Sequence, residues 1–319
     1  MRRSDLNPLI TRTNIVSTDP RLKDPSSVFN PGAIMFKGNI LLLLRIQNRA
    51  RETYLLKAVS QDGIYFKVDQ QPVVFTGLDS CPFAIYHIYD PRITKIEDRY
   101  FVLCALDTNK GCYTGIFETK DFCTLELISI DTGKEYRNAI LFPALFDGSY
   151  CRFERPNNYV ASDGVKTGQS ITCSLSRDLI HWETKQEVFR GRHHYWDELI
   201  GSGPPPLKTK AGWLHIYHGV ATHFGSSNIY QVGVSLHDLH QPWITIARGR
   251  YNILEPRELY ELTGQVPNVV FPSGAIAQKT DAEGFIAPDS PIIIYYGAAD
   301  SCVCRAQTTV NELMEELDA

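Results

Sequence analysis

Side chains that could do chemistry are concentrated in six segments of the chain. Each segment mixes charged residues with aromatic residues and turn formers; they are FNPGA (29–33), RIQNR (45–49), IYDPRI (88–93), YRNAILFP (136–143), FERPNN (153–158) and HYWDELIGSGPPPLKTKAGWLHIYHG (194–219). None has the glycine-rich pattern of a phosphate loop, an HExxH zinc motif or a persuasive Ser-His-Asp order. The side chains that these segments supply are carboxyl groups, arginines, amides and aromatic rings.

The elements that must position these segments are β-strands. Short runs of Val, Ile, Leu, Tyr and Phe are broken by Gly, Pro, Asn and Asp, as in NILLLLRIQ (39–47) and PIIIYYGAAD (291–300). This pattern is typical of strands and turns. The good helix candidate is the C-terminal TVNELMEELDA (309–319).

A repeat organises the strands. Four segments carry Ser or Thr, then Asp, then an aromatic residue: SQDGIYF (60–66), ETKDFCTLE (118–126), SLSRDLIHW (174–182) and SLHDLHQPW (235–243). Their aspartates recur with a period of about 60 residues, and GAAD, which ends at Asp300, comes one period later. The repeat predicts an all-β fold, a five-bladed β-propeller with a short C-terminal helix, forming a single domain over residues 1–319. A pair of β-sandwiches is the rival fold, but it does not explain the spacing.

The repeated aspartates have a structural interpretation. An Asx turn between two outer strands, followed by an aromatic residue that packs on the next blade, needs this residue order and no chemistry. We expect this for Asp121, Asp178 and Asp238. Trp182, Trp213 and Trp243 are expected in the blade cores.

Composition limits the possible partners and location. The net charge is −4 with both signs interspersed, which argues against nucleic acid and against a basic membrane surface. Apolar runs such as 40–44 are too short to span a bilayer, and no signal peptide is visible, so we expect a cytoplasmic protein with reduced cysteines. Cys302 and Cys304 are expected on one face of a strand rather than in a metal half-site, and no metal is expected. Residues 1–20 and the C-terminal helix are candidate contacts of a homo-oligomer.

A series of motifs in order resembles glycoside hydrolase family 130, the mannoside phosphorylases and mannosidases. They are IYDPRI, LFP (141–143), ERPN (154–157), IGSGPPPLKT (200–209), GWLHIYHG (212–219), and VPNVVFPSGAI (266–276) with YYGAAD (295–300). Each motif is weak alone, but together they cover nearly the whole chain. The resemblance implies a five-bladed propeller that breaks β-mannosidic bonds.

The resemblance also implies roles for single residues. Asp90 matches the general acid of the family. An acid is needed because an alkoxide is a poor leaving group, and in this family the proton passes through a hydroxyl of the bound mannose. Without the resemblance, its Asp-Pro dipeptide is more typical of a turn. Family positions that hydrogen-bond sugar hydroxyls fall on Asn30, Arg45, Asp62, Tyr89 and Asp300. Asp62 also fits the turn interpretation.

The second reactant decides the kind of enzyme. Family positions that hold inorganic phosphate, the co-substrate of the phosphorylases, fall on Arg137, Asn138, Arg155 and His218, with Tyr230 as a further candidate. Two arginines and an imidazole at one place would make a positive site suited to a dianion. The alternative for Arg155 is a salt bridge to Glu154.

Two departures from the family pattern leave alternatives open. A lysine of the phosphorylases is Leu199 here, and an arginine is Gln231. Glu154 and Glu198 lie beside the phosphate positions and could activate water, as an inverting β-mannosidase requires. A non-catalytic sugar-binding propeller is a third hypothesis. We expect inverting phosphorolysis of a small β-mannoside oligosaccharide, without other cofactors; the linkage and the acceptor sugar are not predicted.

Overall fold

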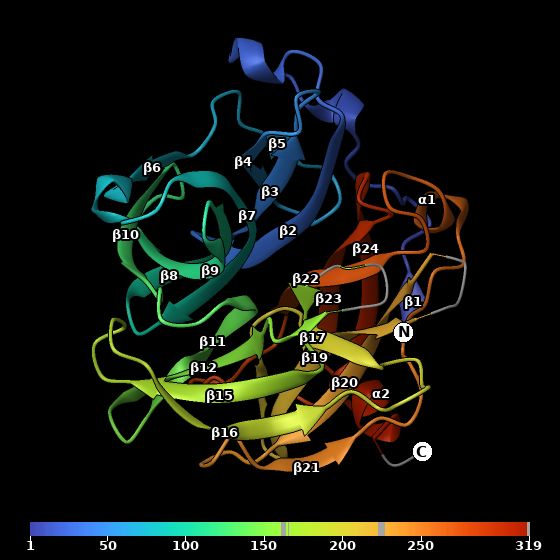
Figure 1. Ribbon diagram of the computed structural model, residues 1–319. Helices are drawn as coiled ribbons and strands as arrows, with labels where there is room; N and C mark the ends of the chain where they lie inside the picture. Colours follow the sequence, from blue (N-terminus) through green and yellow to red (C-terminus); the bar gives the residue numbers. More distant parts are fainter. Residues whose placement is uncertain (161–163, 165, 223–226, 318–319) are drawn as a thin grey trace.

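Apart from one two-stranded hairpin, the strands of the described residues form five sheets arranged around a common centre, as Figure 1 shows for the computed structural model. The structure describes residues 1–160, 164, 166–222 and 227–317. Each sheet is one blade, and the chain passes from the innermost strand of a blade to its outer edge before entering the next. The predicted five-bladed β-propeller is therefore confirmed.

The blades are numbered here in chain order. Blade 1 contains β2 (Ser27–Phe36), β3 (Asn39–Gln47), β4 (Thr53–Ser60) and β5 (Lys67–Val68). Blade 2 contains β7 (Ile85–Ile96), β8 (Arg99–Thr108), β9 (Gly111–Thr119) and β10 (Thr124–Ile130), with β6 (Val74–Thr76) parallel to β10. Blade 3 contains β11 (Tyr136–Phe146), β12 (Ser149–Pro156), β15 (Ser170–Ser176) and β16 (Glu183–Arg190). Blade 4 contains β17 (Leu199–Ser202), β19 (Gly212–Ala221), β20 (Ile229–His237) and β21 (Thr245–Arg248), with β18 (Leu207–Thr209) also paired to β19. Blade 5 contains β22 (Val270–Ala277), β23 (Pro291–Ala298), β24 (Cys302–Thr309) and β1 (Arg2–Arg3).

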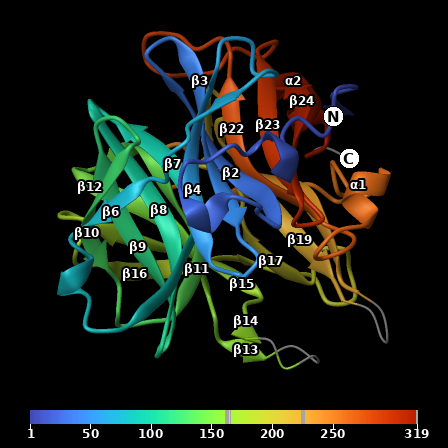
Figure 2. The same ribbon diagram turned by 90° about the horizontal axis from the view of Figure 1, so that it is seen from above.

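A few short elements lie outside the blades. The hairpin of β13 (Tyr159–Val160) and β14 (Lys166–Thr167) follows β12 and projects beyond the blades in Figure 2. The helices are α1 (Leu259–Leu262) and α2 (Val310–Glu315), and 3-10 turns occur at Arg12–Asn14, Pro20–Leu22 and Leu78–Ser80. Helix α2 confirms the helix predicted at 309–319, of which residues 318 and 319 lie outside the described part. No helix within the described residues has the length and apolarity needed to cross a bilayer.

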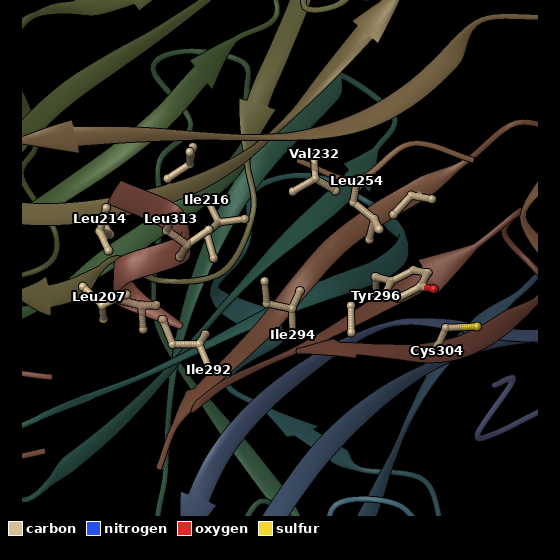
Figure 3. Packing of buried hydrophobic residues seen from close by; sticks show 14 of the residues in the cluster. Leu207, Leu214, Ile216, Val232, Leu254, Ile292, Ile294, Tyr296, Cys304 and Leu313 are labelled. Carbon is tan, nitrogen blue, oxygen red and sulfur yellow. The ribbon is translucent and has the colours of Figure 1, made fainter. Parts of the chain in front are cut away.

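The hydrophobic cores lie between neighbouring blades, because each blade buries both of its faces. In β3, Leu41 and Leu43 pack towards blade 2, whereas Leu42 and Leu44 pack towards blade 5. Alternation along a strand, with burial on both faces, explains the unbroken leucine run. Figure 3 shows the equivalent core between blades 4 and 5, where Ile216 and Val232 face Ile294 and Tyr296. Trp182, Trp213 and Trp243 lie in or against such cores, as predicted.

The N-terminus completes the ring. Arg2 and Arg3 pair with Gln307 and Ala306 of β24, so that the first strand of the chain becomes the outer strand of the last blade. Arg3 also bonds the fully buried carboxylate of Glu261 at 2.8 Å. Arg2 and Arg3 therefore make contacts within the chain, and a contact of residues 1–20 between copies stays a prediction.

The repeated aspartates form the predicted turns between the third and fourth strands of blades 1 to 4. In each, one carboxylate oxygen accepts two successive backbone N–H groups, as Asp121 does from Cys123 and Thr124. The assignment of Asp300 as the fifth member is wrong, because Asp300 lies between the second and third strands of blade 5. The true equivalent is the start of α2, where Thr309 accepts from Glu312 as Thr119 accepts from Phe122.

Candidate active site

A cavity of about 180 Å³ lies where the inner strands meet. Its lining residues are Asn30, Arg45, Asp90, Arg137, Asn138, Arg155, Lys166, Thr167, His218, Tyr230, Val266, Val269, Phe271 and Asp300. Most of the residues predicted for the site are thus brought together from segments far apart in the sequence. A larger hollow of about 460 Å³ on the outer edge of blade 3 contains Asp178. There the carboxylate is already engaged by the backbone of its own turn.

A bulge repeated in three inner strands directs side chains to the cavity. Asn30, Asp90 and Asn138 have φ values of 45°, 54° and 51°, and the pairing of each strand with its neighbour shifts at that residue. A bulge re-aims the side chain at the point where it interrupts the ladder. Asn and Asp tolerate this left-handed conformation better than other residues with a side chain. The local chain geometry therefore explains why Asn or Asp stands at all three of these positions.

Asp90 is held by two donors that share one of its oxygens. Asn30 Nδ2 and Arg45 Nη1 each donate to Asp90 Oδ1 at 2.9 Å. Burial raises the pKa of Asp90, but the charges of Arg45 and Arg92 and the bond from Asn30 outweigh it, so the pKa lies below its ordinary value. Because Oδ1 is occupied by donors, a proton carried by Asp90 belongs on Oδ2.

Arg45 is fixed by two aromatic rings. Its guanidinium carbon lies 4.4 Å from the ring centre of Phe29 and 4.4 Å from that of Tyr89. Such cation–π contacts restrict the guanidinium to one plane. Arg45 is therefore positioned to hold Asp90.

The second carboxyl group of the cavity, Asp300, has a different environment from Asp90. It lies in the turn after β23 with φ 48°, and among the described residues no hydrogen bond reaches its carboxyl group. Burial raises the pKa of Asp300 to about 6; the charge of Asp90 adds to this effect, and that of Arg45 opposes it. The cavity thus contains one carboxyl group that ionises easily and one that keeps its proton to mildly acidic pH.

Tyr89 has a supporting place rather than the predicted contact with sugar. It is 2% exposed and does not line the cavity. Its hydroxyl group donates to Asp107 Oδ1 at 2.8 Å and accepts from Arg137 Nη2 at 2.6 Å. Tyr89 therefore orients both Arg45, through its ring, and Arg137, through its hydroxyl group.

Two arginines face each other across strands β11 and β12. Arg137 and Arg155 are direct partners in the ladder, and both line the cavity. Burial, and then the charge of Arg137, lower the pKa of Arg155 to about 10. Arg155 donates to Asn157 Oδ1 at 3.2 Å, and its buried Nε has no partner among the described residues. Like charges opposite each other destabilise a sheet, so this pair indicates a site for an anion.

His218 completes the anion side of the cavity without adding charge. Burial, and then the charges of Arg155 and Arg92, hold the pKa of His218 well below its ordinary value. The positive charge of the site therefore comes from the two arginines, and both ring nitrogens of His218 are buried without a partner in the described part of the chain. Its ring lies between Tyr230 and Phe271, with centroid distances of 6.1 and 4.6 Å.

Gly201 allows Asn138 and His218 to approach each other. A Cβ atom at this position would lie 2.5 Å from both Asn138 Nδ2 and His218 Cε1. Real side chains do not approach so closely, so the first glycine of the GSGPPP segment is required by the site. Leu199, two residues earlier, is buried on β17 and does not line the cavity.

Three residues proposed from the sequence lie elsewhere. Asp62 is in the turn after β4, where it accepts from Ile64, Tyr65 and Ser60, so the turn interpretation is correct and the sugar contact is wrong. Glu154 pairs with buried Arg152 and accepts from Ser174. Its neighbour Arg155 therefore makes no salt bridge with it.

Glu198 also faces away from the cavity. It accepts from Thr222 at 2.5 Å and lies 3.3 Å from His193. Among the described residues that line the cavity there is no glutamate. The hypothesis that Glu154 or Glu198 activates water for hydrolysis is therefore wrong.

Several lining residues were missed from the sequence. Lys166 and Thr167 come from β14. Val266 and Val269 lie in the segment before β22, and Phe271 is the second residue of that strand. Phe271 lies inside a motif that was recognised, but nothing in its spacing marks it as a wall of the cavity. Lys166 belongs to a short hairpin that has no counterpart in the repeat.

Comparisons with known proteins identify the family. The family model described as β-1,4-mannooligosaccharide phosphorylase, glycoside hydrolase family 130, matches residues 1–319. The β-1,4-mannooligosaccharide phosphorylase of Ruminococcus albus is 29% identical over 98% of this chain and 89% of its own length. The β-1,2-mannobiose phosphorylase of Thermoanaerobacter sp. strain X514 is 31% identical over 87% of this chain and 88% of its own. This chain belongs to glycoside hydrolase family 130.

A solved structure agrees with this assignment over the whole molecule. The β-1,2-mannobiose phosphorylase of Listeria innocua, solved as a complex with β-1,2-mannobiose, has a TM-score of 0.84 and 26% sequence identity to this chain. The match covers 99% of both chains. The fold predicted from the repeat and the fold implied by the motifs are thus the same.

Proposed function

We propose that this protein cleaves β-mannosides by phosphorolysis with inversion, releasing α-mannose 1-phosphate. The observation that carries the proposal is the buried Arg137–Arg155 pair in the same cavity as Asp90. Two guanidinium groups at one place are costly unless an anion binds between them. Membership of a family whose named members are β-mannoside phosphorylases supports phosphate as that anion.

Each residue has a part in the reaction. Phosphate, held by Arg137, Asn138, Arg155 and His218, attacks the anomeric carbon, and the bond from that carbon to the glycosidic oxygen breaks. Asp90 gives its proton, through a hydroxyl of the mannose, to the leaving oxygen. Asn30, Arg45 and Asp300 bind the mannose. Over the whole cycle hydrogenphosphate loses one proton and the released sugar gains one, so atoms and charge balance.

Phosphate also prepares the acid. In the empty cavity the pKa of Asp90 is low, so this residue is ionised at neutral pH. A bound dianion adds negative charge nearby, which disfavours the carboxylate and raises its pKa. Phosphate would then supply both the nucleophile and the reason for Asp90 to carry a proton.

The test is an assay of mannobioses of different linkage with and without phosphate. We expect mannose 1-phosphate to form only when phosphate is present. Equal release of free mannose in phosphate-free buffer would contradict the proposal. The same panel identifies the linkage.

The role of Asp90 is tested with Asp90→Asn. General acid catalysis contributes roughly 10²–10⁴-fold, so turnover of mannobiose should fall by that factor. An aryl mannoside with a good leaving group needs less help from an acid and should lose much less activity. Equal losses on both substrates would assign Asp90 to binding instead of proton transfer.

A further inference from the structure

Lys166 contributes a cationic side chain to the cavity from outside the inner strands. It lies on β14, in the hairpin that follows β12, and lines the cavity together with Thr167. Arg155 is the residue before the end of β12, so the hairpin starts at the anion side of the cavity. This places a lysine near the two arginines without any help from the propeller repeat.

The chain after β14 packs directly on Arg155. A Cβ atom at Gly168 would lie 2.1 Å from the carbonyl oxygen of Pro156 and 2.8 Å from Arg155 Cγ. The backbone at Gly168 therefore touches the stem of Arg155, and Lys166 is two residues away. The end of β14 is thus held close to the residue that is expected to bind phosphate.

Lys166 forms an ion pair with a carboxylate. Its Nζ lies 2.5 Å from Oε1 of Glu135, which is two residues before Arg137. The side chains are 53% and 24% exposed, respectively. An ion pair with this exposure contributes roughly 0–1 kcal/mol, so a competing anion can break it at little cost.

The charge balance of the cavity leaves room for a third cation. Asp90 neutralises Arg45, and His218 is uncharged. A phosphate dianion would meet two positive charges in the cavity lining, on Arg137 and Arg155, and the further charge of buried Arg92 lies outside the lining, while Asp300 adds negative charge above its pKa of about 6. A lysine that exchanges a single carboxylate for a dianion gains electrostatic energy from the exchange.

We infer that Lys166 is a phosphate-binding residue and that Glu135 competes with phosphate for it. This inference rests on the proposed function. Glu135 holds the lysine at the cavity while the site is empty and gives it up when phosphate enters. Lys166 and Glu135 should then affect phosphate binding with opposite signs.

The experiment compares Lys166→Met, Glu135→Gln and the double variant. We expect Lys166→Met to raise the KM for phosphate by about tenfold, the value of one charge-assisted hydrogen bond. Glu135→Gln should lower that KM by about threefold. In the Lys166→Met background, Glu135→Gln should change nothing, because the competitor has lost its target. The KM for mannobiose should stay the same in all three.

Two controls separate a binding role from a structural one. Lys134→Met removes a neighbouring exposed lysine whose Nζ bonds Thr184 Oγ1 at 2.9 Å, away from the cavity, and should leave both KM values unchanged. Lys166→Arg should retain most of the affinity for phosphate. The increase in Tm that phosphate causes without sugar measures the same binding without turnover.

Each outcome gives a decision. If Lys166→Met behaves like Lys134→Met, or if it raises the KM values for phosphate and mannobiose equally, the inference is wrong and phosphorolysis still stands. If the unmodified protein shows neither phosphate-dependent turnover nor a Tm increase with phosphate, both the inference and the proposed function are wrong.

Discussion

The pKa values of the carboxyl groups in the cavity depend on the neighbouring side chains more than on the residue type. Asp90 and Asp300 are both aspartates in a left-handed conformation at the same cavity. Arg45 bonds Asp90 directly, whereas no donor among the described residues reaches Asp300. The pKa values of the two carboxyl groups consequently move in opposite directions.

The raised pKa of Asp300 predicts a cost to folding that grows with pH. Between an unfolded value near 3.8 and the folded value of about 6, the folded state binds more proton than the unfolded state. The free energy of unfolding therefore falls as pH rises through this window. Asp300→Asn removes this cost. Its free energy of unfolding should equal that of the unmodified protein near pH 4 and be about 1–3 kcal/mol higher at pH 7.

Urea unfolding at both pH values measures this difference. Asp62→Asn is a suitable comparison, because the backbone N–H groups of Tyr65 and Ile64 hold the pKa of Asp62 below its ordinary value. Its stabilising effect is present above the unfolded pKa, so Asp62→Asn should lose stability at pH 7. A gain that is the same for Asp300→Asn at pH 4 and pH 7 would show that ionisation is not its cause.

Two buried arginines of the same strand can have different electrostatic partners. Strand β12 carries Arg152 and Arg155, both buried. Arg152 pairs with Glu154 and Asp131, whereas Arg155 faces Arg137. Arg152 therefore stabilises the blade, whereas Arg155 lowers its stability.

This difference predicts opposite effects on stability. Replacing an unpaired buried charge by a hydrophobic side chain is stabilising, so Arg155→Met should raise the free energy of unfolding by about 1 kcal/mol in phosphate-free buffer. The same variant should lose at least about 100-fold in kcat/KM for phosphate. Arg152→Met leaves Glu154 unpaired and should cost about 3–5 kcal/mol. Thermal and urea unfolding check the sign, which would be wrong if both variants were equally destabilised.

The outer turns and inner bulges of the blades show how far the sequence could predict the site. The outer turns were found because Asp121, Asp178 and Asp238 repeat with their aromatic partners. The inner bulges also form a repeat, but Asn30, Asp90 and Asn138 differ in type and are separated by unequal intervals, so they looked like exceptions to the pattern. Asp300 fits the period of the outer turns and is therefore predicted as the fifth of them, although it lies between the second and third strands of blade 5.

Other features depend on contacts that no local pattern contains. The neutral state of His218 follows from burial between Tyr230 and Phe271, and Lys166 reaches the cavity from an insertion. The family motifs located Asp90 and the arginines, but they also suggested a sugar contact for Tyr89, whose hydroxyl group the fold turns towards Asp107. Only the three-dimensional packing distinguishes such support from contact.

The whole molecule is a ring that its two ends must close. Arg3 donates to Glu261, whose carboxylate is fully buried and also accepts from Tyr296. Removing one partner of a buried pair leaves an uncompensated charge.

Arg3→Ala should therefore lower the free energy of unfolding by about 3 kcal/mol. Arg2→Ala, at the exposed neighbouring position of the same strand, should stay within about 0.5 kcal/mol of the unmodified protein. Urea unfolding of both variants is the measurement. Similar effects of the two substitutions would mean that the Arg3–Glu261 contact does not secure the closure.

The closure of the ring also sets the order in which the enzyme can be made. Strand β1 precedes all five blades in the sequence, yet its partner β24 belongs to the last blade and is synthesised after the other four blades. Asn30 and Asp90 are synthesised with blades 1 and 2, and Phe271 and Asp300, which complete the cavity wall, follow only with blade 5. A nascent chain therefore exposes the edge of blade 1 and has no complete catalytic centre until blade 5 has been synthesised, which ties the onset of activity to the appearance of that blade.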